Sequence, residues 1–180
     1  MIAGTSAVGE IGLGARDDMC VDVSRSAGRA PAAARVLAVA SGGGHWIQLR
    51  RIMPAFSDQD VAYVTVNEAC RAEVGSDRFY LINDATRWNK FGIALLALRL
   101  FRIILREKPD IVISTGAAPG YLALRIGRLL GTRTIWLDSI ANVEELSLSG
   151  RCVGRYADVW LTQWPHLAQP DGPHYAGAVV

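Results

Sequence analysis

Short apolar runs alternate with longer amphipathic stretches from residue 35 onward. The apolar runs predict strands of a parallel sheet, because both faces of such strands are buried. The stretches between them predict helices, the longest of which is stopped by Lys108-Pro109. The expected strands cover residues 36–40, 61–66, 79–82, 110–114, 134–137, 157–162 and 174–180, and the expected helices cover 45–56, 88–107 and 121–130.

This alternation predicts an α/β fold: a single Rossmann-like domain with a parallel sheet covered by helices on both faces. The domain is expected over residues 35–180, and no second lobe is visible. Residues 1–34 are rich in Gly, Ala and Ser and lack periodicity, so they are interpreted as a flexible N-terminal extension. A chain of 180 residues is long enough to bury one substantial core.

Composition narrows the function classes. About half of the residues are apolar and the net charge is only +2, which argues against a nucleic-acid partner. The three cysteines form no CxxC pair and no cluster with zinc spacing, so we expect no metal and a reducing compartment. No secretory signal is recognisable, and no uncharged apolar run reaches the ~18 residues of a clear membrane-spanning helix. No cofactor is predicted.

The clearest candidate for chemistry is the loop Ser41-Gly42-Gly43-Gly44-His45, between the first strand and the first helix. Glycines let the backbone approach a ligand closely, and a helix N-terminus offers free N–H groups, which together favour a phosphate. A tight turn without a ligand is the alternative. The loop is no P-loop, and Ile47 stands where a dinucleotide fingerprint needs its third glycine. Glu68 after the second strand keeps a free-standing nucleotide-binding enzyme open as another interpretation.

His45 is the candidate catalytic residue. In the first turn of a helix its protonated form is disfavoured, which suits a general base towards a sugar hydroxyl. It is equally placed to donate a hydrogen bond to a phosphate, and a packing or capping histidine is the alternative.

A second glycine turn, residues 115–120, follows the fourth strand, and Asp138-Ser139 ends the fifth. In an open α/β sheet such turns on central strands face the same crevice. The predicted acceptor- and phosphate-binding residues are Ser41, Gly42, Gly43, Gly44, Thr115, Gly116, Gly120, Asp138 and Ser139.

The helix expected at 88–107 is apolar around most of its circumference and carries arginines on one stripe. A wide apolar arc beside a basic stripe suits a helix lying on an anionic membrane. A core helix with one solvated face and a helix that contacts an apolar protein partner are the alternatives. The predicted membrane residues are Phe91, Leu95, Leu98, Arg99, Arg102 and Arg106.

Several motifs in this order resemble the Alg-fourteen-like polysaccharide-biosynthesis family, which includes the PssD-type bacterial subunits. The resemblance covers roughly residues 35–180. The motifs are the glycine-histidine loop, Ser114-Thr115-Gly116, Asp138-Ser139-Ile140, residues 146–151, Ala157-Asp158 and Gln163-Trp164-Pro165. The family often has glutamate where this chain has Asp138 and arginine where it has Asn142.

The resemblance implies the N-terminal half of a GT-B glycosyltransferase, as in MurG-like enzymes. A separate small catalytic subunit would bind the UDP-sugar. This chain would be an accessory subunit, inactive alone, that binds an isoprenoid-diphosphate-linked sugar acceptor and recruits its partner to the membrane. The pathway class would be exopolysaccharide or lipid-linked oligosaccharide biosynthesis.

By the same resemblance, the chain would lie on the cytoplasmic face of the cell membrane as a peripheral or monotopic protein. The helix at 88–107 would then supply the anchoring. A non-catalytic membrane scaffold with a vestigial site remains a further alternative. The partner would dock at the C-terminal end of the domain, on Trp164, Tyr175, Val179 and Val180.

Overall fold

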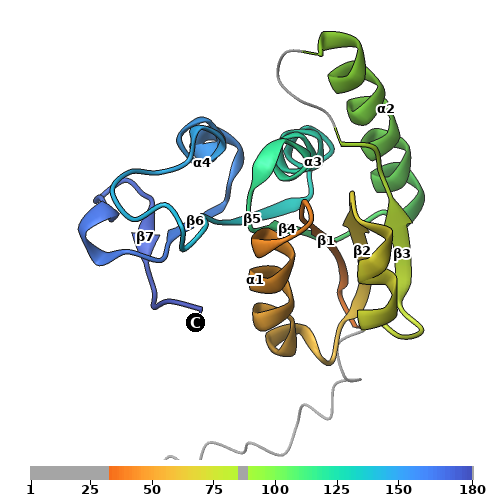
Figure 1. Cartoon of the computed structure of the whole chain (residues 1–180), viewed down its shortest axis with the longest axis horizontal. Helices are drawn as coiled ribbons and strands as arrows, with labels where there is room; N and C mark the ends of the chain where they lie inside the picture. Colours follow the sequence, from red (N-terminus) through yellow and green to blue (C-terminus); the bar gives the residue numbers. More distant parts are fainter. Residues whose placement is uncertain (1–32, 85–88, 180) are drawn as a thin grey trace, which may run out of the picture. The chain divides into compact units, whose positions relative to one another are not determined.

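The computed structural model describes residues 33–84 and 89–179. Within them, one parallel sheet of seven strands has the order β3-β2-β1-β4-β5-β6-β7 (Figure 1). The predicted single α/β domain with a parallel sheet is confirmed. The strands are β1 (Arg35–Val39), β2 (Asp60–Thr65), β3 (Arg78–Leu81), β4 (Ile111–Ser114), β5 (Arg133–Leu137), β6 (Val159–Thr162) and β7 (His174–Tyr175).

Three parts of the sequence predictions fall on residues outside these ranges. The extension over residues 1–34 lies outside them except for its last two positions, so it stays a prediction. Trp88, the expected first residue of the long helix, and Val180, an expected docking residue, also lie outside the described residues.

Helices cover both faces of the sheet. α1 (Gly44–Ile52) lies on one face, and α2 (Lys90–Glu107), α3 (Ala117–Leu129) and α4 (Leu148–Val153) lie on the other (Figure 1). Alternate side chains of β1 enter the two cores: Val36 and Ala38 pack with α1, whereas Leu37 and Val39 pack with α2 and α3. Short 3-10 turns are η2 (Met53–Phe56), η3 (Glu68–Glu73), η4 (Gly154–Tyr156) and η5 (Pro165–Leu167).

Several boundaries differ from the sequence expectation, for local reasons. α1 ends at Ile52, and the chain continues as the 3-10 turn η2, because its second residue, Pro54, has no N–H to donate to an α-helical hydrogen bond. α3 begins at Ala117 rather than Tyr121, with Pro119 inside its first turn, where N–H groups have no helical partner. The expected strand at 174–180 is confined to its first two residues.

α4 was not expected from the sequence. Its first turn is capped by Ser147, whose hydroxyl accepts a hydrogen bond from the Gly150 N–H at 2.8 Å. A serine followed by a short run with two glycines is a weak signal, because glycine lowers helix propensity.

The long helix α2 has two different faces. Leu96, Leu100, Ile103 and Ile104 are buried against the sheet and α3. On the outward face five large apolar side chains are exposed beside three exposed arginines. They are Phe91, Leu95, Leu98, Phe101 and Leu105, with Arg99, Arg102 and Arg106.

Two leucines of α2 test this assignment of faces. Leu100→Ala should lower the free energy of unfolding by about 2–5 kcal/mol, because it removes a fully buried side chain and leaves a cavity. Leu98→Ala, on the exposed face, should change it by no more than about 0.5 kcal/mol. Urea denaturation of both variants measures the difference, and equal losses would contradict the assignment.

Candidate functional site

Both glycine turns emerge at the point where the order of the sheet reverses. β1 pairs with β4, with Val39 opposite Ser114, while the chain after β1 continues to β2 on the other side. The carboxyl ends of β1 and β4 are therefore adjacent, which is where open α/β sheets bind their ligands. The structure brings together the loop at 41–45 and the turn at 115–120, as the sequence predicts.

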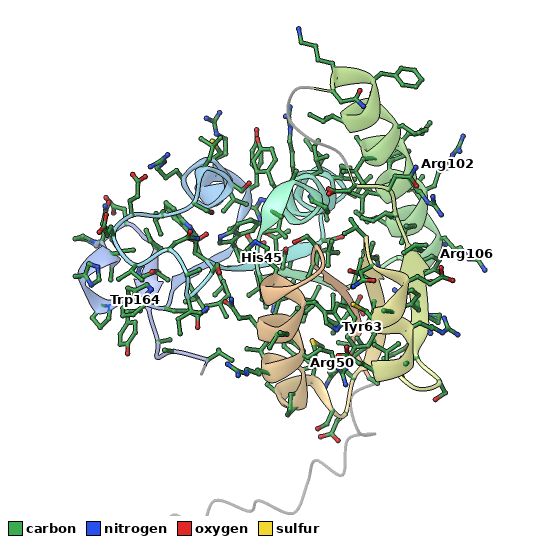
Figure 2. The ribbon with its side chains drawn as sticks, viewed as in Figure 1. His45, Arg50, Tyr63, Arg102, Arg106 and Trp164 are labelled. Carbon is green, nitrogen blue, oxygen red and sulfur yellow. The ribbon has the colours of Figure 1, made fainter. Side chains whose placement is uncertain are left out.

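Two reciprocal hydrogen bonds join these turns. The His45 ring lies with Nδ1 3.0 Å from the Thr115 carbonyl oxygen, and the Thr115 hydroxyl donates to the His45 carbonyl oxygen at 2.7 Å. The ring lies against Gly116, where an added Cβ would come within 2.5 Å of Cε1 and Nδ1. Figure 2 shows His45 where α1 meets the start of α3.

Neither helix that opens here has a side-chain cap. Gly43 precedes α1 and Gly116 precedes α3, with φ angles of 65° and 145° that favour glycine. No acidic residue lies in either first turn, so the partial positive charge of each helix N-terminus is not neutralised locally. Two uncapped helix N-termini side by side form an anion-binding arrangement.

The Thr115 contact determines which nitrogen of His45 carries the proton in the neutral ring. A carbonyl oxygen only accepts hydrogen bonds, so Nδ1 is the donor. Nε2 then keeps its lone pair, and among the described residues it makes no hydrogen bond. This leaves Nε2 as the atom that can accept a proton, whereas a phosphate contact would require the protonated ring.

Gly120 explains how closely α3 approaches β4. A Cβ at this position would collide with the buried Ser114 side chain, and it would come within 3.3 Å of the Trp136 ring. Ser114 in turn accepts a hydrogen bond from the Gly116 N–H at 3.2 Å. Gly120 therefore serves the packing of the turn, and its predicted ligand contact stays a prediction.

Asp138 lies at the same sheet edge, but its carboxylate is directed into the protein. It is buried and accepts hydrogen bonds from the Trp136 indole, the Asn142 amide, and the Ser147 N–H and hydroxyl. None of its hydrogen bonds among the described residues goes to His45. In this structure Asp138 organises the loop after β5, and acceptor binding by it stays a prediction.

Ser139 belongs to a buried amide network that the sequence did not reveal. Gln48 on α1 donates to the Ser139 hydroxyl at 3.0 Å and accepts from Gln163 at 2.7 Å. Gln163, after β6, also donates to the Asp138 carbonyl oxygen at 2.9 Å. Single glutamines within apolar patterns give no recognisable signal, yet these two connect α1 to the ends of β5 and β6.

The residues predicted to dock a partner are partly engaged within the domain. The Trp164 indole donates to the Ile140 carbonyl oxygen at 2.9 Å, and the Val179 N–H donates to Gln163 at 2.8 Å. Tyr175 is exposed. A hollow of about 350 Å³ lies beneath residues 176–179, over the apolar side chains of β5 and β6.

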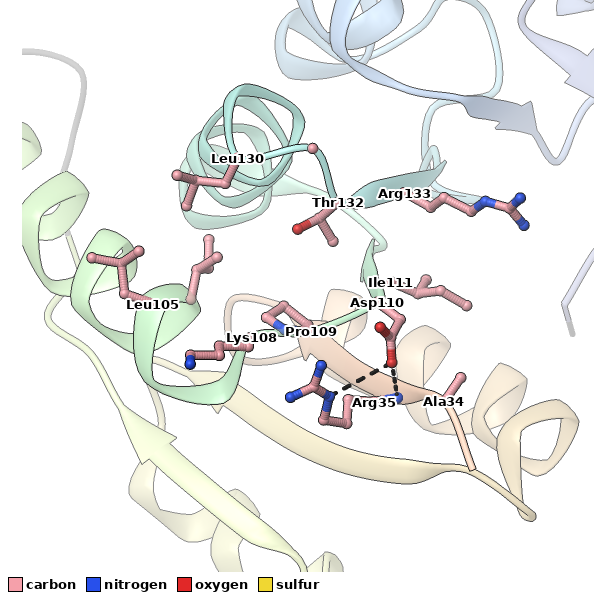
Figure 3. A pocket seen from close by; sticks show the side chains of 12 residues that line it. Ala34, Arg35, Leu105, Lys108, Pro109, Asp110, Ile111, Leu130, Thr132 and Arg133 are labelled. Carbon is pink, nitrogen blue, oxygen red and sulfur yellow. Dashed lines mark hydrogen bonds and ion pairs between the residues drawn. The ribbon is translucent and has the colours of Figure 1, made fainter. Parts of the chain in front are cut away.

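A larger hollow of about 610 Å³ lies at the amino ends of β1, β4 and β5, across the sheet from the glycine turns (Figure 3). Arg35 and Asp110 in its wall pair with each other, N to O at 3.6 Å. It holds none of the predicted site residues. Across residues 33–84 and 89–179, no three His, Cys, Asp or Glu side chains are grouped to hold a metal ion.

The outward face of α2 carries the predicted membrane residues together. Figure 2 shows Arg102 and Arg106 projecting away from the sheet. The single acidic residue of α2, Glu107, lies on another side and forms an ion pair with Arg78 at 2.8 Å. Among the described residues, no helix is both long and apolar enough to cross a membrane.

Comparison with known protein families identifies the family of this chain. A family model described as "Oligosaccharide biosynthesis protein Alg14 like" matches residues 82–179. The chain belongs to this family. The match covers both the second glycine turn and the Asp138 loop, and it confirms the resemblance seen in the sequence.

Relatives in the Alg14 family agree with this membership. The UDP-N-acetylglucosamine transferase subunit ALG14 of Cryptococcus neoformans is 32% identical over 68% of this chain and 64% of its own length. The protein of the same name from Yarrowia lipolytica is 27% identical over 76% of this chain and 63% of its own length. The chain thus spans just under two thirds of these curated relatives.

Solved structures confirm the fold. MurG from Acinetobacter baumannii superposes with a TM-score of 0.66 at 16% identity, covering 81% of this chain and 45% of MurG. A UDP-GlcNAc 2-epimerase from Neisseria meningitidis gives a TM-score of 0.56 at 11% identity, covering 73% of this chain and 40% of the epimerase. The expected likeness to one half of a GT-B glycosyltransferase is confirmed at the level of the fold.

The His45 contact yields a spectroscopic prediction. In long-range ¹H–¹⁵N spectra at alkaline pH, the neutral His45 ring should carry its proton on Nδ1, because the Thr115 carbonyl oxygen accepts it. Exposed His174 is the internal reference. Gly116→Ala should displace the ring and remove the Nδ1–H signature, and a wild-type ring protonated on Nε2 would contradict the assignment.

Proposed function

We propose that this chain is the acceptor-side subunit of a two-chain glycosyltransferase. It binds an isoprenoid-diphosphate-linked sugar and recruits a small catalytic partner that binds the UDP-sugar. The observation that carries the proposal is the pair of uncapped glycine turns, joined through His45 and Thr115, in a member of the Alg14 family. Two adjacent helix N-termini match the two phosphates of a diphosphate.

The names of the relatives and one surface of the domain support a partner chain. The described chain forms a single sheet, and its fold matches 45% of MurG. Relatives in the family are called transferase subunits. The apolar hollow beneath residues 176–179, with exposed Tyr175 nearby, supports docking at the C-terminal end of the domain.

His45 is proposed as the general base, acting through Nε2 on the acceptor hydroxyl. In the complex with its partner, His45→Ala should lower kcat by about 100-fold or more, the usual contribution of a positioned base. His166→Ala is the matched control, because His166 is exposed and lies on another element, where its ring packs beside Trp164 and its one hydrogen bond among the described residues is to the Val143 carbonyl oxygen. Transfer of radiolabelled GlcNAc from UDP-GlcNAc to a lipid-diphosphate acceptor measures the rate.

The outcomes separate the competing functions. Full transfer by the purified chain alone would refute the two-chain arrangement. Unchanged turnover by the His45→Ala complex would instead indicate a scaffold with a vestigial site. Saturable NAD(P) binding that Glu68→Ala abolishes would identify a free-standing nucleotide-binding enzyme, since Glu68 follows β2 at the same sheet edge.

The same proposal places the chain at the cytoplasmic face of the membrane through α2. The outward face of this helix combines exposed apolar side chains with three arginines and no carboxylate. Exposure of apolar side chains to water costs free energy. At an anionic bilayer surface, by contrast, the apolar side chains contact the lipid chains and the arginines contact the negatively charged headgroups, both of which are favourable. This combination supports a helix that lies on the membrane over one that only faces water.

Charge reversal on α2 tests the membrane contact. Arg99, Arg102 and Arg106 replaced together by Glu should weaken binding to phosphatidylglycerol-containing vesicles at least about a hundredfold, since each basic residue contributes about 1 kcal/mol. The control replaces Arg71, Arg125 and Arg133 by Glu, exposed positions on other elements with the same change in net charge. Equal loss in both triple variants would mean that net charge, rather than α2, governs binding.

A further inference from the structure

An apolar slot of about 260 Å³ lies where the first turns of α2, α3 and α4 meet. Three helices that belong to separate parts of the sequence form its walls. The residues that define it are Ile93, Ala118, Tyr121, Leu122, Leu148 and Cys152.

The chemistry of the slot excludes most ligands of a sugar-transfer site. Among residues 33–84 and 89–179, no charged side chain lines it, and the polar side-chain groups that do are the hydroxyls of Tyr121 and Ser149 and the Cys152 thiol. A nucleotide or a sugar needs several converging polar partners. A narrow slot with apolar walls instead favours a hydrocarbon chain.

The position of the slot indicates which hydrocarbon chain it would bind. Ala118 lines the slot and also belongs to the first turn of α3, two residues after Gly116. On the α2 side, Ile93 lies in the first turn of α2, where Phe91 is 80% exposed. The slot therefore lies beside the helix turn that follows Gly116 and beside the first turn of α2.

We propose that this slot receives the isoprene units nearest the diphosphate of the acceptor lipid. The inference rests on the proposed function, and it adds a second recognition element beyond the phosphates. The glycine turns hold the charged head, and the slot distinguishes an isoprenoid diphosphate from a diphosphate without a chain. The rest of the lipid continues past Phe91 into the bilayer.

Cys152 is a reporter for occupancy of the slot, because its thiol lines the wall and is exposed. Cys70 is buried, and burial raises the pKa of its thiol, so it reacts slowly with maleimide. The full chain carrying Cys20→Ser removes the remaining thiol. Farnesyl diphosphate at about ten times its Kd should slow labelling of Cys152 by roughly tenfold, whereas inorganic diphosphate at matched occupancy should not.

A variant of the slot separates the chain from the head group. Leu148→Arg, at an exposed position at the start of α4, should weaken farnesyl diphosphate at least about tenfold, because a charge enters the slot. Its affinity for inorganic diphosphate should not fall. Leu129→Arg, exposed at the other end of α3, is the matched control and should leave both affinities unchanged.

The possible results distinguish this inference from the proposed function. Tight farnesyl diphosphate binding with unprotected Cys152 and an unaffected Leu148→Arg variant would overturn the slot while leaving the acceptor function intact. Equal protection by inorganic diphosphate would also overturn it, because the head group alone would then cover the thiol. Failure of both ligands to bind would overturn the proposed function itself.

Discussion

The structure of the site depends on the pair of hydrogen bonds between His45 and Thr115. These bonds connect two strand–turn–helix units that are 70 residues apart in sequence, and they hold the two helix N-termini side by side. Neither turn alone would place more than one set of free N–H groups near a ligand. The same contact orients the His45 ring, so the pairing of the two helix N-termini and the orientation of Nε2 follow from one interaction.

Helix α2 has one face in the protein core and another exposed to solvent. Its inner face contributes four buried aliphatic side chains to the core. Its outer face keeps large apolar side chains in solvent, where the hydrophobic effect opposes their exposure. The exposure of these apolar side chains is accounted for if a membrane covers them, as proposed above. The adjacent arginines then favour a membrane with anionic headgroups.

The strands and their parallel arrangement followed from the sequence, because buried parallel strands such as β1 and β4 are apolar runs followed by glycine turns, whereas the order of the whole sheet was not predicted. The adjacency of the two glycine turns followed from that topology. The buried contacts of Asp138 did not, since they depend on Ser147 and Asn142, which lie in an irregular loop. The Gln48–Gln163 bond joins residues 115 positions apart, and no local pattern encodes such a pair.

The second glycine turn, the slot and the first turn of α2 lie near one another at the carboxyl edge of the sheet. Under the proposed function, each surface would contact a different part of one amphipathic acceptor: charged groups at the uncapped helices, a short hydrocarbon segment between three helices, and a longer one in the membrane. A soluble nucleotide would contact only the uncapped helix N-termini and would leave the slot and the exposed apolar side chains of α2 unexplained. The proximity of these surfaces is therefore an argument for proposing a lipid-linked acceptor rather than a soluble ligand.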